Sequence, residues 1–140
     1  MNFLLDTNVV SEATRPRPNP RVAEWLKSLD EGRTFVSVIT IAELKRGVTL
    51  MPAGKRRSDL TEWVQVELVE HYKDRALAVT TQIAEVWGQL TADLQRSGTP
   101  IATMDAFIAA TALSHSLTIA TRNVRDFERA GLTVFDPWEL

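Results

Sequence analysis

Short apolar runs alternate along the chain with segments in which apolar residues recur at helical spacing. Apolar, β-branched and aromatic residues make up runs at 3–5, 34–38, 117–120 and 132–135, a composition typical of buried strands. Residues 76–79 are similar and predict a short extended segment. We therefore expect the first four runs to be separate strands and residues 76–79 to be a short extended piece.

Helical spacing of apolar residues fills most of the intervals between these runs. The clearest case runs from Ile83 to Leu94 and ends before Gly98. Asn19 and Pro20 provide an N-cap and a first-turn proline, and Thr40 is expected to open the helix after the second strand. We predict helices at the following positions: directly after Asp6, and over 20–29, 40–48, 60–68, 83–94, 104–113 and 123–131. Strands that alternate with helices predict one α/β domain, with a mostly parallel sheet flanked by helices.

The amino-acid composition indicates a folded protein and excludes every function that depends on cysteine. The chain is 44% hydrophobic and 24% charged, as in ordinary folded domains. It contains no Cys, which excludes disulfides, thiolate metal sites and cysteine nucleophiles. Met1 to Leu5 lead directly into Asp6 without a leader pattern, and no apolar run approaches 18 residues. We therefore expect a cytoplasmic protein that makes no use of a membrane.

The overall charge argues against nucleic-acid binding, whereas the distribution of basic residues leaves it open. The net charge is −2 and the pI is about 5.7, while most nucleic-acid binders are basic. The basic residues are nevertheless clustered, at 15–21, 45–46, 55–57 and 122–129. Either these clusters form a positive rim around an acidic centre, or they are solvated surfaces.

Four acidic residues are expected to converge on one edge of the sheet. Asp6 and Asp126 follow predicted strands, while Glu43 and Asp105 lie in the first turns of predicted helices. Ligand sites of parallel sheets lie at the carboxyl ends of the strands. Two unit charges about 4 Å apart repel by roughly 4 kcal/mol at an effective dielectric of 20, so such a cluster needs a cation. Each acid alone has another explanation: a helix cap, a favourable helix end or a solvated surface position.

An all-oxygen set of ligands favours Mg²⁺ or Mn²⁺ over zinc. Such an ion activates water and neutralises charge on a phosphodiester, so hydrolysis of phosphodiester bonds is the expected chemistry. Four small polar neighbours could orient the carboxylates or merely form turns, and two arginines beside the acids could bind a substrate phosphate. These neighbours are Thr7, Asn8, Thr121 and Asn123, and the arginines are Arg46 and Arg122.

Two other functions remain open at this point. An aspartate-dependent phosphatase would use Asp6 as its nucleophile, but Asn8 stands where such enzymes usually carry a second Asp. A catalytically silent binding module would use the acidic pocket only to hold a partner. His71 and His115 do not form a recognisable acid–base pair, so a metal-free mechanism based on histidines is disfavoured.

Four motifs, in order along nearly the whole chain, resemble the PIN-domain toxins of the VapC type. They are Leu4-Leu5-Asp6-Thr7-Asn8, Ile39-Thr40-Ile41-Ala42-Glu43-Leu44, Asp105 to Ala112 and Ala120 to Phe127. Ser11-Glu12 and the ending Asp136-Pro137-Trp138 are similar to the FitB-like branch. The resemblance implies that residues 1–140 form a single PIN domain, a three-layer sandwich.

The resemblance also implies an activity and roles for the acids. The members of the family that the chain resembles are Mg²⁺- or Mn²⁺-dependent endoribonucleases, the toxins of type II toxin-antitoxin systems. By motif, Asp6 and Asp105 would be the principal metal ligands, with Glu43 and Asp126 completing the catalytic site. Asn123 stands where some relatives carry Asp, which leaves Asp126 as the only acid in the last motif.

Finally, the resemblance implies partners. The substrate would be structured RNA such as tRNA or rRNA, and a cognate antitoxin would silence the enzyme, in one version by inserting an Arg into the acidic pocket. A homodimer or a larger toxin-antitoxin assembly is also implied. The helix face that carries Trp63 and Leu68 could pack between subunits, or it could be ordinary core.

Overall fold

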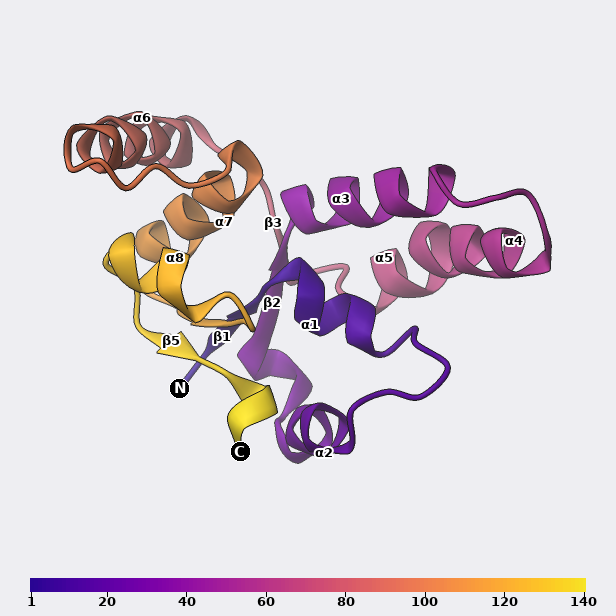
Figure 1. Ribbon diagram of the computed structural model, residues 1–140. Helices are drawn as coiled ribbons and strands as arrows, with labels where there is room; N and C mark the ends of the chain where they lie inside the picture. Colours follow the sequence, from indigo (N-terminus) through magenta and orange to yellow (C-terminus); the bar gives the residue numbers. More distant parts are fainter.

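The computed structural model describes residues 1–140 and contains a five-stranded sheet covered by helices on both faces (Figure 1). The strands are β1 (Phe3–Leu5), β2 (Thr34–Ser37), β3 (Ala76–Leu77), β4 (Thr118–Ala120) and β5 (Val134–Phe135). They lie in the order β3-β2-β1-β4-β5, and every neighbouring pair is parallel. The predicted α/β class with a mostly parallel sheet is confirmed.

The central strand β1 supplies both cores of the protein. Successive side chains of a strand point to opposite faces, and accordingly Phe3 and Leu5 join one buried cluster while Leu4 joins the other. Registers that pair Leu4 with Phe35 of β2 and with Ile119 of β4 keep the strands level. The carboxyl ends of these three strands therefore form one common edge.

Helices form the two outer layers. They are α1 (Thr7–Glu12), α2 (Pro20–Ser28), α3 (Val38–Thr49), α4 (Lys55–Glu62), α5 (Val69–His71), α6 (Thr81–Arg96), α7 (Thr103–Ser114) and α8 (Val124–Arg129). Residues from α1 to α4, and Tyr72 directly after α5, pack into or against the cluster with Leu5, and residues from α6 to α8 pack into the cluster with Leu4. Figure 1 shows α6 to α8 on one side of the strands and α3 to α5 on the other. This arrangement is the expected three-layer sandwich.

The start of α3 differs from the prediction. The helix begins at Val38 and not at Thr40, because Ser37 at the end of β2 caps it: the Ser37 hydroxyl accepts a hydrogen bond of 3.0 Å from the Ile39 N–H. Thr40 is instead fully buried within the first turn. The strand is correspondingly one residue shorter than expected.

The helical segment that begins at residue 55 is longer than predicted. A π-helical stretch, η2 (Trp63–Leu68), joins α4 directly to α5. Leu68 is 3% exposed within the chain's own core, and Trp63 packs against that core. Leu68 is therefore ordinary core, and the exposed apolar residues of this segment are Val66 and Val69.

Two short 3₁₀ helices were not predicted: η1 (Glu31–Arg33) before β2, and η3 (Pro137–Glu139) at the end of the chain. The η3 turn packs against α2, where Trp138 is buried. None of the helices combines the length and the apolar character needed to span a lipid bilayer.

Candidate functional site

Asp6 lies at the junction of β1 and α1 and is 4% exposed. Its backbone N–H donates to the Ala120 carbonyl (2.9 Å), which fixes the residue beside the end of β4. Its Oδ1 accepts from the Thr7 N–H (2.8 Å), so Asp6 is the N-cap of α1. The capping role considered from sequence is thus real, and it holds the carboxylate in one orientation at the sheet edge.

Two side chains hold the second oxygen of Asp6. Its Oδ2 accepts from the Thr121 hydroxyl (2.7 Å) and from the Asn8 amide (3.3 Å). A carboxylate has about four acceptor positions, and these bonds with the cap occupy three. Asp6 is therefore oriented by neutral donors and keeps one position for another ligand.

Glu43 is connected to this centre through Thr7. The Thr7 hydroxyl donates to Glu43 Oε1 (2.7 Å), and its oxygen also lies 3.2 Å from the hydroxyl oxygen of Thr40. Glu43 lies on α3, so these contacts join the helix after β2 to the helix after β1. Thr40 was not identified from sequence as a site residue. Thr40 lies between two apolar residues, Ile39 and Ile41, and nothing in this sequence context distinguishes a site residue from an ordinary helix residue.

Asp105 lies in the first turn of α7 and is half-buried. Burial, together with the charges of the other three acids, raises its pKa from 3.8 to about 6, and burial contributes most. Burial also raises the pKa of Asp6 above its usual value; hydrogen bonds from Thr121 and Thr7 oppose this increase, and the charge of Glu43 adds to it. The four acids predicted from sequence therefore share one electrostatic environment at the sheet edge.

Asp126 is held by Asn123. The Asn123 amide donates to Asp126 Oδ2 (3.2 Å), and the Asn123 N–H donates to the Thr121 hydroxyl (2.9 Å). Asp126 lies in the first turn of α8, but it does not cap that helix, whose N-cap Asn123 makes no capping side-chain bond. Asp105 lies in the first turn of α7, where its charge complements the helix N-terminus, as considered from sequence.

No cation from the chain compensates these acids. The three ion pairs of the protein join Arg15 to Glu12, Lys55 to Asp59 and Arg96 to Asp93. No three His, Cys, Asp or Glu side chains are gathered closely enough to form a ready-made metal cage. Even so, the donor chemistry fits a hard divalent cation, because every available ligand is an oxygen and the shared charge raises the pKa of Asp105.

The two candidate arginines differ in position. The Arg122 N–H donates to Asn8 Oδ1 (3.4 Å), and its guanidinium lies over the Trp138 ring, 5.3 Å from the centroid. Arg46 is exposed on α3, one turn beyond Glu43, and forms no hydrogen bond or ion pair through its side chain. Arg122 is thus tied to the site, whereas Arg46 only flanks it.

The histidines stay outside the site. His71 ends α5 and packs against Tyr72, with the ring centroids 4.7 Å apart. His115 is the exposed C-cap of α7, at the opposite end of that helix from Asp105.

Residues 3–132 match the PIN domain family. The chain is 42% identical over 136 residues to the toxin FitB of Neisseria gonorrhoeae, covering 97% of this chain and 98% of FitB. It is 37% identical over 137 residues to the VapC ribonuclease Y4jK of Sinorhizobium fredii, covering 98% of each. It is also 31% identical over 140 residues to the tRNA(fMet)-specific endonuclease VapC of Shigella flexneri, covering 99% of this chain and 98% of that protein.

Solved structures agree with these sequence relationships. The structure of FitAcB from Neisseria gonorrhoeae superposes with a TM-score of 0.93 at 42% identity, covering 99% of both chains. VapBC-5 of Mycobacterium tuberculosis, described as a member of the VapBC family of toxin-antitoxin systems, gives a TM-score of 0.66 at 26% identity, covering 96% of this chain and 95% of that one.

Proposed function

This chain belongs to the PIN-domain family, together with the FitB and VapC ribonuclease toxins, and from that premise we propose that it is the toxin of a type II toxin-antitoxin system. Its activity is that of a divalent-metal-dependent endoribonuclease. The observation that carries the proposal is a set of four acids at one sheet edge, without an internal cation, whose mutual charge helps to raise the pKa of Asp105 to about 6.

The acids divide the work of the site. Asp6 and Asp105 would hold Mg²⁺ or Mn²⁺, while Glu43 and Asp126 would complete the negative site. The chemistry that such a cation would supply is activation of water and neutralisation of the charge that develops on the phosphodiester. Four neighbouring residues keep the carboxylates oriented through the hydrogen bonds described above: Thr7, Asn8, Thr121 and Asn123. In metal sites, residues that hydrogen-bond to the metal ligands have this role.

The substrate of the proposed reaction is structured RNA, and the names of two relatives, a ribonuclease and a tRNA endonuclease, support RNA as the substrate class. One of them is named a tRNA(fMet)-specific endonuclease, so tRNA is the first substrate to test, followed by rRNA. Arg46 and Arg122 would contact the RNA backbone beside the acids. In the cytoplasm a cognate antitoxin would hold the enzyme silent, and a homodimer would be the unit that the antitoxin binds.

The decisive assay incubates the protein with total RNA and with defined tRNA, in the presence of Mg²⁺, Mn²⁺ or a chelator. We expect cleavage with either metal, none with the chelator, and none with Asp105→Asn. Asp59→Asn is the matched control, because Asp59 is an exposed acid on α4 that pairs only with Lys55. Cleavage that survives the chelator or Asp105→Asn would overturn the assignment.

The same experiment separates the competing functions. A phosphatase would hydrolyse a generic phosphomonoester and leave RNA intact; the Asn8 amide, bonded to Asp6 and Thr121, cannot serve as its acid. A silent binding module would capture a partner protein and would not cleave RNA, whichever metal is added.

A further inference from the structure

A basic pocket of about 410 Å³ opens at the end of α1 that lies away from Asp6. Its charged lining consists of Glu12, Arg15, Arg17 and Arg122, and its wall includes Trp138. Three arginines and one glutamate give the lining a net charge of +2, in a chain whose total is −2. The pocket is therefore positively charged although the protein as a whole is negatively charged.

Glu12 fixes the loop that carries two of these arginines. It is 6% exposed, its Oε2 accepts from the Asn19 N–H (2.8 Å), and its Oε1 lies 3.4 Å from Arg15 Nε. Pro16 and Pro18 restrict the backbone of the same loop. Because Arg15 already compensates Glu12, the charge of Arg17 remains available to a ligand.

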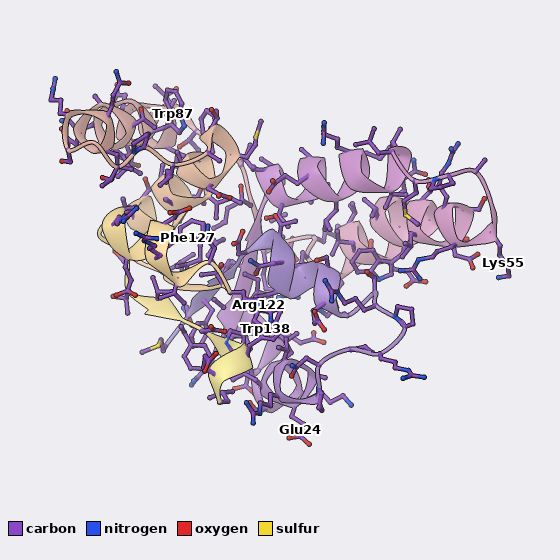
Figure 2. All side chains as sticks on the ribbon, viewed as in Figure 1. Glu24, Lys55, Trp87, Arg122, Phe127 and Trp138 are labelled. Atoms are coloured by element: carbon purple, nitrogen blue, oxygen red, sulfur yellow. The ribbon has the colours of Figure 1, made fainter.

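Arg122 is held on the other wall. Its guanidinium lies over Trp138, and the two side chains lie next to each other in Figure 2. Trp138 is itself anchored, since it is 8% exposed and its carbonyl accepts from Arg21 Nη1 (3.2 Å). A guanidinium on such a support is oriented in advance, which lowers the entropy cost of binding a phosphate.

The pocket is physically connected to the acidic edge. Arg122 directly follows Thr121, which bonds Asp6, and Asn8 bonds both Asp6 and the Arg122 backbone. Glu12 is six residues beyond Asp6 along α1, about 9 Å at 1.5 Å per residue. A stacked strand advances about 3.4 Å per nucleotide, so this separation corresponds to two to three nucleotides.

We propose that Arg17 and Arg122 bind a backbone phosphate of the RNA two to three nucleotides from the bond that is cut, while Arg15 neutralises Glu12 beside them. This inference rests on the proposed function. The acidic edge by itself repels a polyanion, and a fixed positive pocket one short helix away offsets that repulsion while setting the direction of the strand. Guanidinium groups suit phosphate because they bind its oxygens in pairs.

The test measures binding separately from cleavage. In an Asp105→Asn background without divalent metal, the affinity of an RNA dodecamer is measured by fluorescence anisotropy over a range of salt concentrations. Arg17→Ala with Arg122→Ala should weaken binding at least about tenfold, and should lower the salt slope by about 0.7, the contribution of one single-strand phosphate contact. A variant that carries Arg17→Ala with Arg122→Lys should bind RNA more tightly than the double alanine variant does.

Arg33→Ala is the matched control. Arg33 is an exposed arginine that directly precedes β2, at the opposite edge of the sheet from the acids, and its removal should change the affinity less than twofold. The phosphate site is overturned if the Arg17→Ala, Arg122→Ala variant binds RNA as tightly as the Arg33→Ala control does. It is also overturned if the Asp105→Asn protein binds no RNA. Lost binding of a polyglutamate peptide with unchanged RNA binding assigns the pocket to a protein partner and also overturns it.

Cleavage by the otherwise wild-type chain then separates the two proposals. If the protein cuts RNA and the double variant has a raised KM with little change in kcat, both proposals stand. Cleavage with an unchanged KM overturns only the pocket. Absence of any cleavage overturns the proposed function, and the binding measurement still decides the pocket.

Discussion

The two ends of α1 each hold a buried carboxylate, and only one of the two has a cationic partner. Glu12, 6% exposed, pairs with Arg15 and accepts a backbone N–H. Asp6, 4% exposed, accepts only from neutral donors, and its pKa is raised. Burying a charge without compensation is costly. Glu12 is therefore a structural anchor, whereas Asp6 lacks a cation within the chain, as our proposal of an external metal ion requires.

The polarity of α1 sharpens the contrast. Partial positive charge at a helix N-terminus favours Asp6, and partial negative charge at the C-terminus disfavours Glu12. The chain nevertheless supplies its cation to Glu12 and none to Asp6. Glu12 thus has the counter-ion Arg15 at the helix end that disfavours a negative charge. Asp6 has no counter-ion, and three further acids add to the negative charge around it.

The largest expected effect is on catalysis. Asp6→Asn keeps an oxygen that can accept the Thr7 N–H, so the fold should persist, but a metal ligand loses its charge. RNA cleavage should fall at least about 100-fold, because even the outer groups of metal sites are worth 10- to 100-fold. Single-turnover cleavage of a defined RNA measures the change, with Asp59→Asn as control. Activity above a tenth of wild type would contradict the role of Asp6.

The next effect is on stability, at the other end of the helix. Glu12→Gln leaves Arg15 without its partner and weakens the bond from the Asn19 N–H, so the free energy of unfolding should fall by about 1.5–3 kcal/mol. Urea denaturation measures this loss. The exposed Lys55–Asp59 pair is the reference, because breaking it with Asp59→Asn should cost less than about 0.5 kcal/mol. Equal costs for the two substitutions would show that Glu12 is no anchor.

The smallest effect has the opposite sign. The pKa of Asp105 is raised from 3.8 to about 6, so its contribution to stability is fully present below pH 3.8 and is lost as the pH rises through 6. Without metal, Asp105→Asn should therefore stabilise the protein at pH 7.5, by about 1 kcal/mol once solvent screening is allowed for.

Thermal denaturation between pH 4 and pH 8 provides the check on Asp105. The stability advantage of the Asn variant should grow with pH, and Mg²⁺ should reverse it at pH 7.5 by stabilising only the wild type. A variant that is less stable than wild type at pH 7.5 without metal would refute the electrostatic account of Asp105.

Much of the fold and the acidic set was predictable, because both depend on local patterns and on the order of elements. Apolar runs predicted the strands, and parallel strands bring Asp6 and the residues after β4 to one edge. The small polar neighbours of the acids were expected to orient the carboxylates, and Thr121 does so, but its pairing with Asp6 was not predictable: the two residues lie 115 positions apart, and only the pairing of β1 with β4 brings them together. The Ser37 cap was missed because Thr40 offered an equally good start for the helix.

Glu12 illustrates a different limit. An acid at the end of a short helix is usually solvated, and nothing in its neighbours distinguishes a buried, paired Glu from an exposed one. Its burial follows from the packing of the 13–19 loop against α1, through the Asn19 N–H and Arg15. Trp138 was noted only as part of a motif, and its contact with Arg122 depends on where the last turn of the chain packs.

The contrast between paired and unpaired acids can be tested most directly by titrating Mn²⁺ into the protein in a calorimeter. We predict saturable binding to wild type and to Asp59→Asn, and an affinity at least tenfold weaker for both Asp6→Asn and Asp105→Asn. Wild-type affinity in either of these two variants, or absence of binding to wild type, would contradict the claim that the acidic edge holds a catalytic metal.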